Sequence, residues 1–342
     1  MQGFGFGKPP QGVIFDCDMG NGIDDALALA MLYGLDGKNE ARVVSVSVSK
    51  SNLKSAAFCE VVGRFYAGEV SGAIGAVGRT LPVGMANDGK MAQDTPMLTG
   101  PLSRTGPDGK PVYRHGIEKL NDTGDVAAVI RNALSSQYDQ NAVMLLAGPS
   151  TNLVLTLDLP DVRELAAKKL KMLVVAAGSY PSGGPEFAIQ EDIAAARKLF
   201  ADWPTAIVAV GSEVGVALPF PGSSIEKDFG WSQAHPIADA YRAYKPMPYD
   251  APSTAMAAAL YAVRPQERYF RLSEAGVISV LDSGAAKFTA SAQGKHKYLI
   301  VDPAQKERVI KTYIELASAK PAPPRQRFRS QRKKDDAPPK KQ

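Results

Sequence analysis

Residues 13–29 read Val-Ile-Phe-Asp-Cys-Asp-Met-Gly-Asn-Gly-Ile-Asp-Asp-Ala-Leu-Ala-Leu, and this stretch sets the first expectations for the fold. Its opening apolar run is typical of a short buried strand, and its end continues into a helical pattern over residues 24–35. Ligands bind at the carboxyl ends of parallel strands, so we expect the residues between strand and helix to border a ligand site. These residues include four aspartates, Asp16, Asp18, Asp24 and Asp25.

The alternation of apolar runs with helical patterns continues along the chain. Apolar and β-branched runs predict strands at residues 43–48, 142–147, 172–177 and 205–210. Helical spacing predicts helices over residues 52–67, 190–200, 253–263 and 304–319. Strands that alternate with helices imply an α/β fold with a mainly parallel central sheet and helices on both faces. Residues 276–301 are expected to add antiparallel strands.

The chain has 342 residues, which suits one large α/β domain. We assign residues 12–319 to this domain, because no internal repeat or clear boundary divides them. Within it, residues 84–116 are rich in turn formers and are expected to form an insertion or lid. Residues 1–11, rich in Gly and Pro, are expected to be a flexible lead, and residues 320–342 a disordered basic tail.

The positive charge of the chain is concentrated in that tail. The net charge is +5, and nine Lys or Arg against two Asp from Lys320 onward give +7, so the remainder carries −2. A body of this charge gives no reason to expect specific nucleic-acid binding. No stretch approaches the roughly 18 apolar residues of a membrane span. The N-terminal residues leave a cytoplasmic location open, and a secreted or periplasmic one if this end is processed.

The close spacing of the aspartates has a chemical and a structural explanation. Neighbouring carboxylates repel one another unless a cation neutralises them, and hard oxygen donors favour Ca²⁺ or Mg²⁺. Alternatively, Asp24 and Asp25 stand where the first turn of a helix favours negative charge. That alternative does not account for Asp16 and Asp18 at the end of a strand. The local sequence alone leaves both explanations open.

Two enzyme families open with a similar motif. Residues 13–18 resemble the first motif of the haloacid-dehalogenase-type phosphatases, but Met19-Gly20-Asn21 differs from the Gly and Thr or Val that usually come next in that family. The whole segment is more similar to the nucleoside hydrolases of the inosine–uridine-preferring type, with Asp-x-Asp, a Gly-containing turn and Asp-Asp-Ala. Four further matches occur in order: Asn52, Gly-Pro-Ser-Thr-Asn at 148–152, Glu-Phe-Ala-Ile at 186–189 with Asp192 and Ala195, and Tyr249-Asp250.

The resemblance implies a Rossmann-related open sheet and a Ca²⁺ site. Its ligands would be the carboxylates of Asp18, Asp25 and Asp250 and the main-chain oxygen of Thr151. Asp18 would also be the catalytic base, taking a proton from a metal-bound water. The implied reaction is the hydrolysis of an N-glycosidic bond of a ribonucleoside or a related ribosyl compound.

The resemblance also implies the remaining contacts of the site. Asp24, Asn52 and Glu186 would bind the small nucleoside-like substrate, and Asp16 would support the site from behind. A role in purine or pyrimidine salvage and a homo-oligomer, a dimer or tetramer, are implied as well.

Several positions depart from the family pattern. Ala188 replaces an Asn that binds ribose, and its side chain offers neither donor nor acceptor. Gly183-Gly184 lacks a second family Asn, Tyr249 replaces a His, and Gly22 stands where an Asp is frequent. An alternative function is therefore a hydrolase-fold protein with altered or lost catalysis that binds a metal and a sugar-like ligand. Of the histidines, His115 is a candidate lid residue, whereas His235 and His296 are expected to be structural or exposed.

Overall fold

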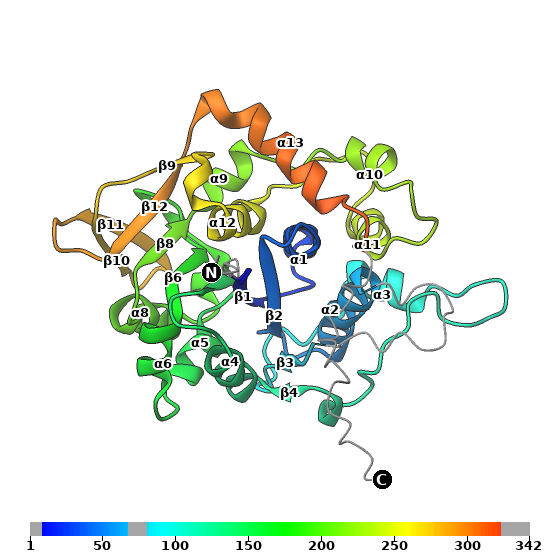
Figure 1. Cartoon of the computed structure of the whole chain (residues 1–342), viewed down its shortest axis with the longest axis horizontal. Coiled ribbons are helices and arrows are strands. Elements are labelled where there is room, and N and C mark those ends of the chain that lie inside the picture. The colour runs from blue at the N-terminus through cyan, green and yellow to red at the C-terminus, as the bar shows by residue number, and fades with distance from the viewer. Residues whose placement is uncertain (1–8, 68–80, 323–342) are drawn as a thin grey trace, which may run out of the picture.

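Strand β1 (Gln11–Cys17), where the acidic segment starts, lies inside the central sheet of the computed structural model (Figure 1). The structure describes residues 9–67 and 81–322. Within these residues the main path of the sheet runs in the order β4 (Gly124–Asp125), β3 (Val83–Met85), β2 (Ala41–Val48), β1, β5 (Ala142–Ala147), β6 (Leu170–Ala176), β8 (Ile207–Val210), β12 (His296–Val301), β10 (Gly276–Val280), β11 (Ala285–Ala290) and β7 (Ser182–Pro185).

The sheet is mainly parallel. Every neighbouring pair from β4 across to β12 is parallel, whereas β10, β11 and β7 extend the sheet with antiparallel pairs. Strand β9 (Phe270–Leu272) pairs antiparallel with β12. The predicted fold class is confirmed, and the parallel order brings the carboxyl ends of β1, β5 and β6 to the same edge.

Helices cover both faces of the sheet (Figure 1), and β1 shows how the sequence separates them. Val13, Phe15 and Cys17 pack into one core, while Ile14 packs into the other, because successive side chains of a strand point to opposite faces. The first core is formed with α1 (Ile23–Gly37), α2 (Leu53–Tyr66), α11 (Pro236–Tyr244), α12 (Thr254–Val263) and α13 (Lys306–Ala317). The second is formed with α4 (Val126–Ser135), α5 (Thr151–Leu157), α6 (Val162–Lys169) and α8 (Ile193–Asp202).

Helix α1 is buried on almost every side, which fixes the position of the acidic segment at its start. Every residue from Ala26 to Leu32 is fully buried, and α12 and α13 pack beside the helix. A side chain at Gly34 would place its Cβ 2.2 Å from the main-chain oxygen of Leu316 in α13. The glycine therefore permits the close approach of these two helices.

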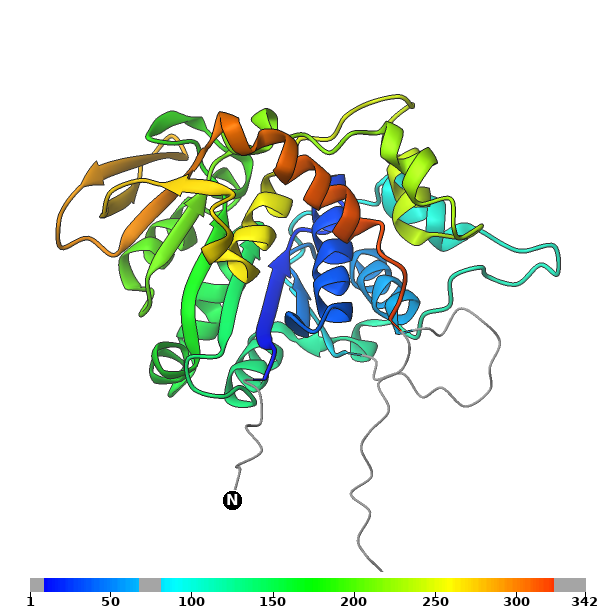
Figure 2. The same cartoon turned by 45° about the horizontal axis from the view of Figure 1, so that its top comes forward.

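The interval 84–116, which we expected to be an insertion or lid, begins inside the sheet. Gly84 belongs to β3, which pairs with β2 and β4, and residues 96–103 form α3 (Pro96–Ser103). Figure 2 shows α3 beside α11, and the two helices pack against each other. A strand of three residues is too short for a periodic pattern, and the adjacent turn formers concealed it.

The remaining predictions agree with the structure, differ from it at element boundaries, or lie outside the described residues. The predicted strands correspond to β1, β2, β5, β6 and β8, and residues 276–301 contain the antiparallel pairs of β10. Gln11, assigned to the lead, is the first residue of β1, and most of the predicted tail lies outside the described residues. No helix of the described chain is long and apolar enough to span a membrane. Short helices complete the fold at α7 (Phe187–Gln190), α9 (Ser212–Ala217) and α10 (Ser223–Asp228).

Candidate active site

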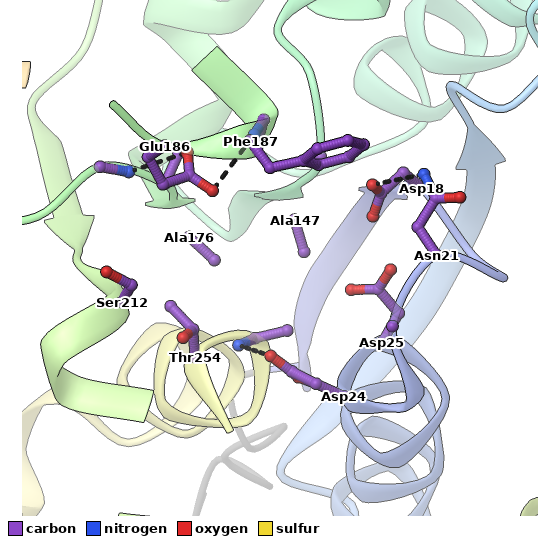
Figure 3. Close-up of a pocket in the computed structure, with 16 residues that line it drawn as sticks. Asp18, Asn21, Asp24, Asp25, Ala147, Ala176, Glu186, Phe187, Ser212 and Thr254 are labelled. Carbon is purple, nitrogen blue, oxygen red and sulfur yellow. Dashed lines mark hydrogen bonds between the residues drawn. The ribbon is translucent and has the colours of Figure 1, made fainter. Parts of the chain in front are cut away.

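A pocket of about 300 Å³ opens at the carboxyl ends of β1, β5 and β6 (Figure 3). This volume is at the lower end of the range for small-molecule sites, roughly 300–1,000 Å³. Ala147 and Ala176, at the ends of β5 and β6, form its floor together with Gly148 and Ala177. The pocket therefore lies where the parallel order of the sheet predicted a ligand site.

Three of the four predicted aspartates face this pocket. Asp18 follows β1, Asp24 and Asp25 lie in the first turn of α1, and Figure 3 shows their carboxyl groups pointing into the same space. Burial raises the pKa of Asp18, raises the pKa of Asp24 to about 7, and raises the pKa of Asp25 well above its usual range. The negative charge of Asp18 adds to the increase at Asp24 and Asp25.

The donors that face the pocket suit a hard cation. Asp24 Oδ1 and Asp25 Oδ2 are buried and have no hydrogen-bond partner among the described residues. Buried carboxylate oxygens without partners are costly unless a cation or a ligand group satisfies them. The same described residues contain no ready-made group of three or more His, Cys, Asp or Glu side chains around a metal. The arrangement fits a cation held by two carboxylates, Asp18 and Asp25, with its other ligands from water or substrate.

Two predicted metal ligands do not line the pocket. Asp250 is exposed, and its Oδ1 accepts a hydrogen bond of 2.9 Å from the main-chain nitrogen of Gly222. Thr151 is the first residue of α5, and its hydroxyl donates to Asp192 Oδ2 over 2.8 Å. At the start of α12, which follows Asp250, Thr254 and Ala255 face the pocket instead. Neither of these side chains carries charge.

Asn52, predicted to contact the substrate, has a different set of partners. Its Oδ1 accepts hydrogen bonds from the main-chain nitrogens of Lys54 and Ser55 and so caps α2. Its Nδ2 donates to the main-chain oxygen of Ala92 and to Asp94 Oδ1. The side chain lies outside the pocket lining and joins α2 to residues 92–94.

Glu186 and its neighbours form the wall opposite the aspartates (Figure 3). Glu186 accepts hydrogen bonds from the main-chain nitrogens of Gly178, Ala188 and Ile189, and burial raises its pKa despite them. Phe187 lies at the pocket with 49% of its surface exposed, whereas Ala188 is buried. This wall presents an aromatic ring and a methyl group where the resemblance predicted a ribose-binding amide.

Asp16 lies behind the pocket and does not line it. It is fully buried, and its Oδ2 accepts hydrogen bonds from Ser47 and, at 2.8 Å, from Asn152 Nδ2. A Cβ at Gly148 would lie 2.9 Å from the main-chain nitrogen of Asp18, so glycine is needed there. The phosphatase alternative requires Asp16 as an exposed nucleophile, and its burial argues against that function.

Residues that the sequence did not single out surround Asp18. Asn21 Nδ2 donates to Asp18 Oδ2 over 2.9 Å, and the ammonium of Lys50 donates to Asn21 Oδ1 over the same distance. Lys50 follows β2, and a lysine directly after a buried strand would have been the available signal. The histidines remain apart: His115 Nδ1 lies 3.1 Å from the main-chain oxygen of Ile117, and His235 and His296 are buried, as the structural interpretation predicted.

A mainly parallel sheet with an acidic pocket at the carboxyl end of its first strand defines an α/β protein with a candidate hydrolytic site. The sequence model of the inosine-uridine preferring nucleoside hydrolase family matches residues 13–312, and the chain belongs to this family. The family comprises metal-dependent N-glycosyl hydrolases of ribonucleosides. No curated protein sequence matches the chain.

Solved structures of nucleoside hydrolases have the same fold. A purine-preferring ribonucleoside hydrolase from Gardnerella vaginalis is 16% identical, with a TM-score of 0.65 over 90% of this chain and 98% of the other. A plant nucleoside hydrolase is 19% identical, with a TM-score of 0.63 over 91% and 100%. An inosine-uridine preferring enzyme from Bacillus anthracis is 16% identical, with a TM-score of 0.62 over 90% and 99%.

Proposed function

We propose that this chain hydrolyses the N-glycosidic bond of a ribonucleoside or a related ribosyl compound in purine or pyrimidine salvage, with Asp18 as general base and Ca²⁺ as the activating metal. The observation that carries the proposal is the convergence of the Asp18, Asp24 and Asp25 carboxyl groups on one pocket, with two buried oxygens that have no partner within the described chain. Such a site has both the charge and the free acceptors that water activation needs.

Asp18 and Asp25 are the residues that would hold the metal. Both present carboxylate oxygens, which suit Ca²⁺, and their buried charges repel each other without a cation. When bound, the metal supplies a lowered pKa for a coordinated water. With Thr151 and Asp250 outside the pocket lining, water and sugar hydroxyls would complete the shell.

The aspartates account for the activation of the water and for the charge that develops on the sugar. Asp18 takes one proton from the attacking water, whose oxygen forms a bond to the anomeric carbon while the bond from that carbon to the base nitrogen breaks. The bonding electrons leave with the base, which gains a proton from solvent. Positive charge develops on the ribose, and the adjacent carboxylates stabilise it. Asp24 Oδ1, free of other partners within the described residues, is placed to accept from a ribose hydroxyl.

The other side of the pocket suits the base. Phe187, a half-exposed residue of the pocket lining, offers its ring to the flat face of a base, and Glu186 is held in place by three main-chain donors. The ribose would therefore lie toward the aspartates and the base toward Phe187.

The proposal includes the predicted homo-oligomer, a dimer or tetramer. Light scattering of the purified protein measures this oligomeric state.

The purified chain with Ca²⁺ is tested against a panel of purine and pyrimidine ribonucleosides, with base release followed by chromatography. We expect release from at least one nucleoside, strong reduction by a chelator, and loss in Asp18→Asn. A known nucleoside hydrolase assayed in parallel validates the conditions. Absence of release by the wild type, with release by that control enzyme, contradicts the proposal.

A second candidate function is supported by the residues that face a sugar in the pocket. Ala188 and Ala255 provide no polar side chain to a sugar, and Asp250 is outside the pocket. These features favour a protein that binds a metal and a ribosyl ligand with altered or lost catalysis. Calorimetry that detects nucleoside binding, in a preparation that releases no base, would identify this function in place of the first.

A further inference from the structure

Lys50 is a lysine whose side chain is buried beside the acidic end of the pocket. It follows β2, and its exposed fraction is 0%. A buried ammonium is costly unless it is paired, so its placement requires an explanation. The acidic segment supplies one, because Asp18 interacts electrostatically with Lys50.

A short hydrogen-bonded chain joins Lys50 to Asp18. The ammonium donates to Asn21 Oδ1 over 2.9 Å, and Asn21 Nδ2 donates to Asp18 Oδ2, also over 2.9 Å. The main-chain nitrogen of Asn21 donates to the main-chain oxygen of Asp18 as well. Asn21 is thus fixed from both ends, and its amide orientation is set by the cation on one side and the carboxylate on the other.

The other carboxylate near Lys50 is engaged elsewhere. Asp94 accepts from Asn52 Nδ2 and pairs with Lys54, which lies on the exposed side of α2. The ammonium of Lys50 is therefore linked to Asp18 in the pocket through Asn21. No carboxylate of the described residues forms a direct ion pair with it within 4 Å.

We propose that Lys50 is a built-in counter-ion of the acidic cluster, which orients Asp18 through Asn21 and competes electrostatically with a metal cation for the charge of that cluster. Lys50 is thus a positioning residue and does not touch the substrate. The inference rests on the proposed function in one respect, namely that Asp18 and Asp25 bind a cation.

This arrangement has two consequences for metal binding. First, the acidic cluster is partly neutralised without metal, so its binding of Ca²⁺ is weaker than its number of carboxylates suggests. Second, a neutral residue at position 50 removes a like charge from the neighbourhood of the metal. A unit charge acts strongly on a neighbouring cation in a buried setting, so Ca²⁺ binding should tighten by about tenfold or more.

The test is isothermal titration calorimetry of Ca²⁺ into the full chain and three variants. Lys50→Gln removes the charge and keeps a donor for Asn21, Lys50→Met removes both, and Lys50→Arg keeps the charge. We expect Lys50→Gln and Lys50→Met to bind Ca²⁺ at least about tenfold more tightly than the wild type, and Lys50→Arg to match it. If Lys50 only filled space, the Ca²⁺ affinity of the variants would not depend on the charge at position 50.

The melting temperature in Ca²⁺ and in chelator provides a second readout for variants of low stability. The proposal predicts a larger Ca²⁺-induced increase for the neutral variants than for the wild type. Equal or weaker Ca²⁺ binding in the neutral variants, or no binding in any of them, overturns the proposal. The test of Lys50 measures Ca²⁺ binding and does not depend on turnover. A wild type that releases no base would therefore refute the proposed function without affecting the test of Lys50.

Discussion

The two walls of the pocket differ in charge and in origin. The acidic wall, defined by Asp18, Asp24 and Asp25, comes from the single segment that joins β1 to α1. The second wall, defined by Ala176, Glu186, Phe187, Ala188 and Ala255, comes from three separate segments, namely β6, the start of α7 and the start of α12. Three of the four carboxylates that line the pocket thus come from one contiguous segment. The second wall contributes mainly shape and apolar surface, and its one carboxylate, Glu186, accepts hydrogen bonds from three main-chain nitrogens.

The largest effect that distinguishes the walls is expected at Asp18. Asp18→Asn removes the proposed general base and should reduce kcat/KM about 10³-fold, within the usual range for such a group. The matched control is Asp250→Asn, which changes an exposed aspartate near a similar helix start and should leave activity within about twofold. Steady-state base release measures both. Equal losses of activity in the two variants would show that the metal site extends to Asp250. The metal ligands would then not be confined to the acidic wall.

The support of the acidic wall is tested at Asn52. Asn52→Ala removes the cap of α2 and the bonds to residues 92–94, and should lower the free energy of unfolding by about 2 kcal/mol. The control Asp125→Ala removes an N-cap with a single hydrogen bond and should lower it by about 1 kcal/mol. Urea denaturation measures both values. A raised KM in Asn52→Ala, with an unchanged free energy of unfolding, would show that Asn52 binds the substrate.

The charge of the second wall can be changed at Ala255. Ala255→Asp places a carboxylate in the first turn of α12 beside Asp24, whose Oδ2 accepts a hydrogen bond of 2.8 Å from the main-chain nitrogen of Ala255. We expect Ca²⁺ binding to tighten by about tenfold, since a further hard donor is added. Calorimetry measures the change, with Ala255→Asn as the uncharged control. No change in affinity would show that Ala255 does not face the cation.

The smallest expected effect concerns Phe187. Phe187→Ala removes the aromatic surface proposed for the base and should raise KM about fivefold with little change in kcat, because base–aromatic stacking contributes roughly 1–3 kcal/mol. Leu155→Ala, a half-exposed residue of α5 outside the pocket lining, is the control. A loss confined to kcat would place Phe187 in catalysis and not in binding.

The fold and the acidic wall could be predicted from the sequence, because both depend on local pattern. The strand, the turn and the helix that carry Asp18, Asp24 and Asp25 are contiguous, so their order along the chain fixes their proximity. The position of Asp250 relative to the pocket could not be predicted in the same way. It depends on the backbone conformation of residues 250–254 before α12. That conformation is determined by the contact with Gly222 and by the packing of α12 against α9, and not by a sequence motif. Asn52 has the same problem, since an N-cap and a ligand contact require the same residue type.

The division of the pocket into two walls is tested most directly by a crystal structure with Ca²⁺ and a non-hydrolysable ribonucleoside analogue, in which anomalous scattering locates the cation. We expect one Ca²⁺ between the carboxylates of Asp18 and Asp25, a ribose hydroxyl against Asp24, and the base beside Phe187. A cation coordinated by Asp250, or a ribose bound against Ala188 with the base toward the aspartates, would contradict this division.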